Sequence, residues 1–173
     1  MNKTILWACA FLVSLDGGLS LADGGTMARI SESGDAIEFT QQGDGRVVKT
    51  ALPLYRAGGV RYFSAGVGLE ERAAKYPPFP LKLVFTAGGK PFLAGVSVTI
   101  QPVKGGAALA IPEERVEGPW LFVDLAPGLY NITGMYGGGK QVLKGVTVEA
   151  GKQQTIYLRW AGDRGLSKPL PSE

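Results

Sequence analysis

The residues from Gly118 to Trp160 read GPWLFVDLAPGLYNITGMYGGGKQVLKGVTVEAGKQQTIYLRW, and this stretch decides the fold class. It contains short runs rich in Val, Ile, Leu, Tyr and Thr, each bounded by glycine or proline. Upstream, LKLVFTA from Leu81 and VSVTIQP from Val96 repeat the pattern. Runs of this length with turn residues between them are typical of the strands of a β-sandwich. The sequence therefore predicts an all-β, antiparallel sandwich between Leu81 and Trp160, a length sufficient for one compact domain.

The alternation within each run predicts which side chains face the core. Successive side chains of a strand point to opposite faces, so every second apolar residue shares one face. The predicted core set is Val96, Val98, Ile100, Trp120, Phe122, Tyr130, Ile132, Ile156 and Leu158. Trp120 is therefore expected to be a core residue and not a platform for a sugar.

The same stretch resembles the second half of a carboxypeptidase regulatory-like domain, which is a transthyretin-like (prealbumin-like), Ig-like β-sandwich of seven strands. The features that carry the resemblance are an aromatic strand, a leucine, a Pro-Gly turn, a tyrosine two residues later, a glycine-rich hairpin and a closing strand. In this chain they are Trp120, Phe122, Leu125, Pro127, Gly128, Tyr130, Gly137 to Gly139, and Ile156 to Leu158. The segment PLKLVFTAGGKPFLAGVSVTI, from Pro80, resembles the first half.

The resemblance implies an accessory module that spaces or docks other parts of a protein and does not cleave peptides. Some relatives in the superfamily bind starch or other glycans. The Pro-Gly turn is expected to be of type II, because Pro127 presets φ at the first central position and Gly128 can adopt the positive φ required at the second. Tyr130 is then expected to re-enter the sandwich with its ring inward and its hydroxyl toward the rim.

The first residues predict export from a bacterial cell. Lys3 precedes an apolar run from Ile5 to Leu15, and Ser20 and Ala22 place small side chains where a signal peptidase reads, so residues 1–22 are predicted to be a cleaved signal peptide. Cys9 lies inside the apolar run, which argues against a lipid anchor. The run is too short to span a bilayer, and no later stretch approaches the necessary length. The mature protein is expected to be periplasmic or secreted, without a transmembrane segment.

Composition excludes several classes of chemistry. The chain has no histidine, and its single cysteine lies in the predicted signal peptide, so zinc hydrolysis, Ser-His-Asp catalysis and Cys-His catalysis are excluded. No cofactor or metal site is expected. Cleavage leaves 18 − 1 = 17 basic and 15 − 1 = 14 acidic residues, a net charge of +3. The basic residues are scattered, which does not favour a nucleic-acid partner. A glycan hydrolase with two carboxylates from distant strands stays open as the least favoured alternative.

Residues 23–78 are predicted to form an N-terminal β-meander followed by one short helix, residues 79–160 the sandwich, and residues 161–173 a tail. The segment GVGLEER from Gly66 looks like a phosphate-binding turn, but Glu71 stands where a dinucleotide fingerprint requires its third glycine. We expect instead a bend and a short connecting helix, and the alternative is an exposed docking loop. Leu69, Ala73 and Tyr76 would share the face that packs on the sandwich.

The predicted function is that of an exported, non-enzymatic binding or envelope accessory protein, whose partner is another envelope protein or a glycan. The alternative is a carbohydrate-binding module. The candidate interaction residues are Tyr136, Gly137, Gly138 and Gly139 at a hairpin tip, and Trp160 at the end of the last strand.

Overall fold

The computed structural model describes residues 26–43, 46–88 and 92–161. Within these residues the chain is mostly β with one short α-helix, as predicted, and its strands form three sheets, none of them closed. No helix among them is both long and apolar enough to cross a membrane. The predicted signal peptide, with Cys9, and all of the tail after residue 161 lie outside the described residues.

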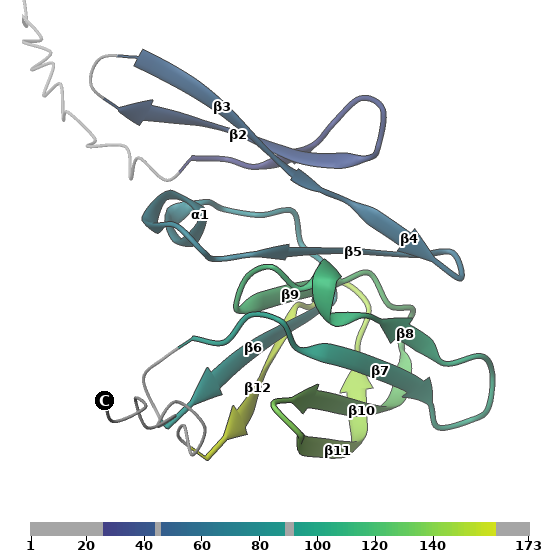
Figure 1. Cartoon of the computed structure of the whole chain (residues 1–173). Helices are drawn as coiled ribbons and strands as arrows, with labels where there is room; N and C mark the ends of the chain where they lie inside the picture. Colours follow the sequence, from purple (N-terminus) through teal and green to yellow (C-terminus); the bar gives the residue numbers. More distant parts are fainter. Residues whose placement is uncertain (1–25, 44–45, 89–91, 162–173) are drawn as a thin grey trace, which may run out of the picture.

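The three sheets form layers, with the five-stranded sheet in the middle (Figure 1). The three-stranded sheet has the order β1 (Arg29–Ile30), β2 (Ala36–Gly43), β3 (Arg46–Pro53). The five-stranded sheet has the order β12 (Gln154–Trp160), β6 (Leu81–Ala87), β9 (Trp120–Val123), β5 (Val60–Ala65), β4 (Tyr55–Ala57). The four-stranded sheet has the order β11 (Gly139–Val148), β10 (Gly128–Tyr136), β7 (Ser97–Pro102), β8 (Leu109–Ile111). Helix α1 spans Leu69–Ala73, and a 3-10 turn, η1, spans Glu113–Arg115.

Two hydrophobic cores separate the layers. The main core lies between the four-stranded and five-stranded sheets and includes Leu81, Leu83, Phe85, Val96, Val98, Ile100, Leu121, Val123, Leu125, Tyr130, Ile132, Leu158 and Trp160. The second core lies between the five-stranded and three-stranded sheets and includes Ile37, Phe39, Phe63, Phe79 and Phe122. The Phe63 and Phe122 rings stack in parallel there, with centroids 4.6 Å apart. The five-stranded sheet is thus buried on parts of both faces.

For the strand at Trp120, the prediction of which side chains face the main core is wrong. Phe122 lies in the second core, and Trp120 packs against that core, whereas Leu121 and Val123 face the main core. All four residues of β9 are apolar, because both faces of this strand are covered, and a continuous apolar run contains no period that tells one face from the other.

Contrary to the prediction from the sequence, the pairing of the strands is not purely antiparallel. β12 pairs with β6 in parallel, from Gln154 beside Leu81 to Trp160 beside Ala87, whereas the other pairings between named strands of the described residues are antiparallel. β12 follows β11 along the chain but joins a different sheet. Its partner is therefore chosen by packing in three dimensions and not by a local turn.

The N-terminal meander is divided between two sheets. β1, β2 and β3 form their own sheet, whereas β4 and β5 extend the five-stranded sheet through the pairing of β5 with β9. The expectation that the meander packs on or extends a sheet of the sandwich is met in both ways. The boundary predicted at residue 78 consequently separates strands that share one sheet.

The turn at Pro127 is not of the predicted type II, because Gly128 is not among the glycines with positive φ. A Cβ atom at Gly128 would lie 3.4 Å from the Tyr130 ring, which is ordinary contact. Tyr130 is buried, and its hydroxyl donates a 2.7 Å hydrogen bond to the Ala126 carbonyl. The corner is therefore held by the tyrosine and not by an unusual glycine conformation.

Candidate functional site

The tip of the β10–β11 hairpin is a two-residue turn. Tyr136 pairs with Gly139, and the intervening Gly137 and Gly138 have φ of 52° and 77°. Two consecutive positive φ values are the requirement of a type I′ turn, which joins twisted strands without splaying them. The predicted interaction residues of this loop are therefore, first of all, what the hairpin geometry demands.

Trp160 lies against the same hairpin but is only 7% exposed. Its indole N–H donates a 3.1 Å hydrogen bond to the Gly139 carbonyl, and its ring meets the Tyr136 ring edge to face at 6.1 Å. Cβ atoms at Gly134 and Gly139 would lie 3.1 Å and 2.9 Å from the indole. The glycines thus form a slot for Trp160, which is a core residue and does not offer its ring to a partner.

The structure brings the hairpin and Trp160 together as a structural unit. Of the predicted interaction residues, Tyr136 is 38% exposed, and its neighbour Met135 is exposed to a similar degree. The Cβ positions of Gly137 and Gly138 have no atom within 4 Å, so the turn itself is open to solvent.

The loop before α1 already contains an anion. The Glu71 carboxylate accepts hydrogen bonds from the backbone N–H groups of Gly66, at 2.6 Å, and Val67, at 3.0 Å. A phosphate would need these donors, and the chain's own carboxylate occupies them. Gly66 adopts φ +98°, and a Cβ there would lie 2.9 Å from the Trp120 indole, so glycine is required by both conformation and space.

Two further side chains hold this loop. The Arg72 guanidinium donates to the carbonyls of Gly66, at 2.8 Å, and Val67, at 3.3 Å, so Glu71 and Arg72 together satisfy both polar groups of the two residues. The Tyr76 hydroxyl donates to the Glu71 carbonyl at 2.9 Å, and burial raises the pKa of this hydroxyl. The loop and α1 are fixed by polar contacts, because α1 buries none of its residues.

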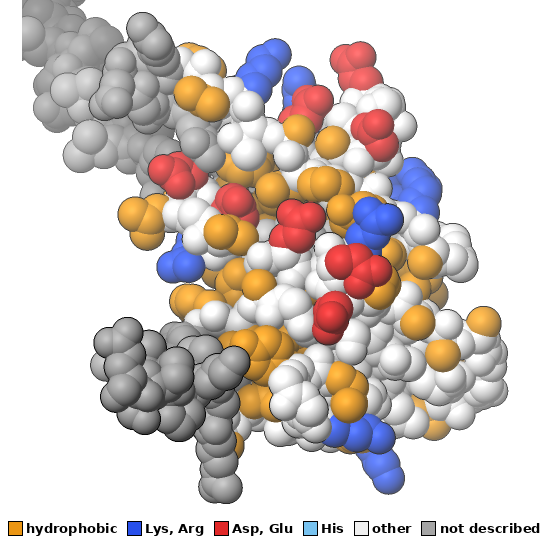
Figure 2. Space-filling model, viewed as in Figure 1, with side chains coloured by type: hydrophobic (Ala, Val, Ile, Leu, Met, Phe, Trp, Pro, Cys, Tyr) orange, Lys and Arg blue, Asp and Glu red, His pale blue; other side chains and the backbone are white. Residues whose placement is uncertain are grey.

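The predicted apolar stripe of α1 is wrong for Leu69, which is 77% exposed. Only Tyr76, beyond the end of α1, packs as expected, against the rings of the second core. Val67 and Phe92 are also exposed, at 60% and 45%, and the Arg72 guanidinium lies 4.9 Å from the centre of the Phe92 ring. We call Val67, Leu69 and Phe92 the α1 patch. Figure 2 shows hydrophobic side chains at the surface on the side of the molecule where α1 lies.

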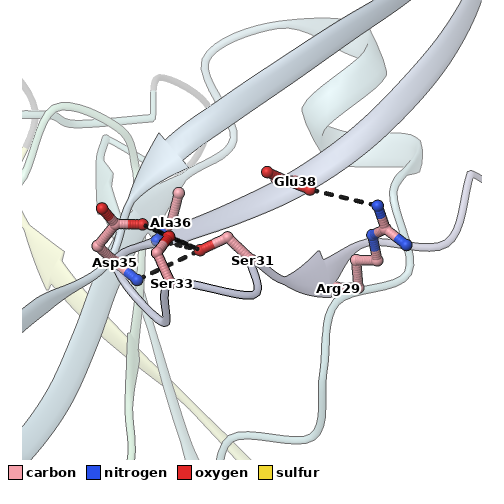
Figure 3. A network of polar contacts seen from close by, with 6 residues as sticks. All are labelled: Arg29, Ser31, Ser33, Asp35, Ala36 and Glu38. Carbon is pink, nitrogen blue, oxygen red and sulfur yellow. Dashed lines mark hydrogen bonds and ion pairs between the residues drawn. The ribbon is translucent and has the colours of Figure 1, made fainter.

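A polar network at the β1–β2 turn is the closest approach to a serine-carboxylate pair (Figure 3). The Ser31 and Ser33 hydroxyls both donate to Asp35 Oδ1, and Ser31 Oγ also accepts from the backbone N–H groups of Asp35 and Ala36. Hydrogen bonds from Ser33 and then Ser31 lower the pKa of Asp35, which makes it a weaker base. The network closes a turn and has no group that would activate a nucleophile.

Arg61 and Lys82 are the other charged side chains with contacts between strands that bear on a site. Arg61 donates to Asp124 Oδ2 from Nε, at 2.9 Å, and from Nη2, at 2.6 Å, and so ties β5 to the end of β9. Within the described residues no three acidic side chains gather as a metal site requires. The Lys82 ammonium lies 3.6 Å from the centre of the Trp120 ring, and partial burial lowers the pKa of Lys82.

Sequence reasoning missed Val67, Phe92 and Lys82 as surface features. No local pattern marks the exposure of either residue, since Val67 stands between two glycines and Phe92 between Pro91 and Leu93. Lys82 had a signal, because it occupies an alternate, polar position of the run LKLVFTA and therefore points away from the main core.

Comparison with known proteins adds no assignment: no family model, no curated protein and no solved structure matches the chain.

Proposed function

We propose that this chain is an exported, non-enzymatic β-sandwich protein of the carboxypeptidase regulatory-like type, acting as an accessory subunit that docks onto another protein of the bacterial envelope. The observation that carries the proposal is the α1 patch. Val67 is exposed on the loop whose backbone is held by Glu71 and Arg72, Leu69 is exposed at the start of α1, and Phe92 is exposed beside Arg72. Exposed apolar groups gathered in one place mark interaction surfaces more often than they serve stability.

The rigidity of the loop supports docking. A loop that is already ordered loses little conformational entropy when a partner covers it, so more of the contact energy appears as affinity. Leu69 contributes nothing to either core in the described structure, so its exposed position is not explained by folding.

The assignment to the Ig-like type of sandwich rests on the hydrogen bond of Tyr130 to the backbone of the preceding turn. A tyrosine whose hydroxyl returns to the backbone a few residues upstream is a hallmark of Ig-like sandwiches, and Tyr130 donates to Ala126 in this way. Two facing sheets around one main core support the same assignment.

The alternatives have less support. A carbohydrate-binding module for neutral sugars requires exposed, coplanar aromatic rings, but Trp120 packs against Gly66 and carries the Lys82 ammonium on its ring. A glycan hydrolase requires two carboxylates facing each other across a cleft. Asp35, Glu71 and Asp124 are each engaged in contacts of their own.

The proposal is tested by site-specific crosslinking in the producing cell. A photo-reactive amino acid replaces Leu69 in one variant and Thr147, which is exposed on the four-stranded sheet, in a matched control. We expect one discrete adduct with an envelope protein from position 69 and none from position 147. Val67→Asp should remove the adduct without changing the thermal unfolding midpoint. No adduct at position 69, or the same adducts at both positions, contradicts the proposal.

A further inference from the structure

The outer face of the five-stranded sheet is covered over only part of its width. The three-stranded sheet packs on β5 and β9 through the second core, whereas the outward side chains of β12 are exposed. The outward positions of β6 are Lys82 and Thr86, which are partly exposed, and Val84, which is buried; those of β12 are Thr155, Tyr157 and Arg159, which are exposed. We call these six residues the β6–β12 face.

The register aligns these side chains in rows across the strands. Thr155 lies beside Lys82, Tyr157 beside Val84, and Arg159 beside Thr86. Lys82 and Arg159 therefore stand at opposite ends of the face, separated by roughly 13 Å along the strand direction at about 3.3 Å per residue. Tyr157, which is 52% exposed, lies between them.

Both cations of the β6–β12 face lie over aromatic rings. The Lys82 ammonium lies over Trp120, and the Arg159 guanidinium lies 5.3 Å from the centre of the Tyr157 ring. None of the six residues of the face is acidic, and within the described residues neither Lys82 nor Arg159 forms a salt bridge. Contact with an aromatic ring holds a cation in position without neutralising it.

The arrangement disfavours binding of a neutral sugar and favours binding of an anion. Stacking of a neutral sugar needs a bare ring, and here the Trp120 and Tyr157 rings carry the protein's own cations. Arg159 is exposed and Lys82 is partly exposed, and the register places Thr155 beside Lys82 and Thr86 beside Arg159. Two positive charges separated along one strand pair complement a linear chain that carries repeated negative charges.

We propose that the β6–β12 face binds an acidic polysaccharide, with carboxylates of the chain at Lys82 and Arg159 and sugar hydroxyls at Thr86 and Thr155. The chain lies along the strands, and the edge of the Tyr157 ring supports it between the two cations. The face adjoins the α1 patch at Thr86, which forms a β-bridge with Phe92. The variants at Lys82 and Arg159 leave Val67 and Leu69 unchanged, so failure of polysaccharide binding is distinguishable from failure of protein docking.

The test measures the affinity of the mature protein for polygalacturonate and for its fully methyl-esterified form, which has the same backbone without charge. Isothermal titration should show saturable binding of the charged polymer that weakens with added salt, and no binding of the ester. Lys82→Gln with Arg159→Gln should lower the affinity about tenfold or more, because charge-assisted hydrogen bonds are lost at both ends. Arg159→Gln alone, at an exposed position, should lower it in part without affecting folding.

A matched control removes two charges elsewhere. Lys140→Gln with Lys144→Gln changes the net charge equally on exposed positions of β11, and we expect the affinity to stay within about twofold of the parent value. An equal loss in this control shows unspecific charge attraction and overturns the proposal. Binding of the ester as tight as that of the acid also overturns it, as does the absence of saturable binding. Co-sedimentation with phosphatidylglycerol vesicles, without polysaccharide binding, would assign the face to a membrane and overturn it as well.

Discussion

Gly134→Ala tests whether the Trp160 slot specifies the packing of the hairpin. A Cβ at this position would lie 3.1 Å from Trp160 Cη2 and 3.3 Å from Cζ2, closer than ordinary contact. Gly134 does not have positive φ, so alanine introduces no backbone strain. In a strand without this contact, alanine would be neutral or stabilising by up to about 1 kcal/mol relative to glycine. Overpacking of a filled core costs about 1–3 kcal/mol, so we expect net destabilisation.

A double-mutant cycle with Trp160→Leu measures how much of the destabilisation by Gly134→Ala comes from its contact with the indole. Loss of the buried indole destabilises the protein by itself, by about 2–4 kcal/mol. The added methyl group of Gly134→Ala then has room, so the double variant should be more stable than the sum of the single effects predicts, by about 1 kcal/mol or more.

The assay is urea unfolding followed by far-ultraviolet circular dichroism, supported by thermal scans in which 1 kcal/mol corresponds to roughly 2–4 °C for a chain of this size. Thr133→Ala, at the adjacent half-buried position of β10, is the control and should show no coupling to Trp160→Leu. If the changes in the free energy of unfolding caused by Gly134→Ala and Trp160→Leu are strictly additive, the packing of Trp160 against Gly134 is refuted.

Three further outcomes follow from individual contacts. Leu69→Ser should change the free energy of unfolding by less than about 0.5 kcal/mol, because this side chain is exposed; a loss of 2 kcal/mol or more, about the cost of truncating a buried leucine, would show that it is buried. Tyr130→Phe should cost about 1 kcal/mol by removing the hydroxyl's hydrogen bond to the backbone, and an unchanged urea midpoint would contradict that bond. Hydrogen bonds from Ser33 and Ser31 lower the pKa of Asp35 below its ordinary 3.8, so its contribution to stability is present above that pH and is lost as the pH falls through the folded-state pKa. Asp35→Asn should therefore reduce the loss of unfolding free energy as the pH falls below about 4. An unchanged slope of this free energy against pH in the acid range would contradict this.

The sequence by itself determined the β class, the presence of one short helix and most of the main core. Val96, Val98, Ile100, Ile132 and Leu158 are buried in that core as their alternation predicted. Alternation is a local property, because each strand's two faces are set by the geometry of the backbone. The composition is likewise independent of the fold: the given sequence contains no histidine and so offers no imidazole as a base or a metal ligand.

Only the tertiary structure decided where β9 points, since its apolar residues fit either face and the choice depends on what covers each face. The same holds for β12, whose parallel pairing with β6 depends on a strand more than sixty residues away. Leu69 shows the converse limit. Its helical spacing predicted burial, but an apolar stripe is buried only if a neighbouring element reaches it.

For the candidate surfaces, too, part was predictable from the sequence and part depended on the tertiary structure. Tyr136 and Trp160 were both proposed from the sequence as interaction residues, but burial of the indole depends on the slot left by Gly134 and Gly139 on another sheet. The pairing of Lys82 with Trp120 joins residues far apart in the chain. A sequence pattern specifies the face on which a side chain lies, whereas the neighbours that cover it, and so its exposure and chemistry, arise only when the sheets pack together.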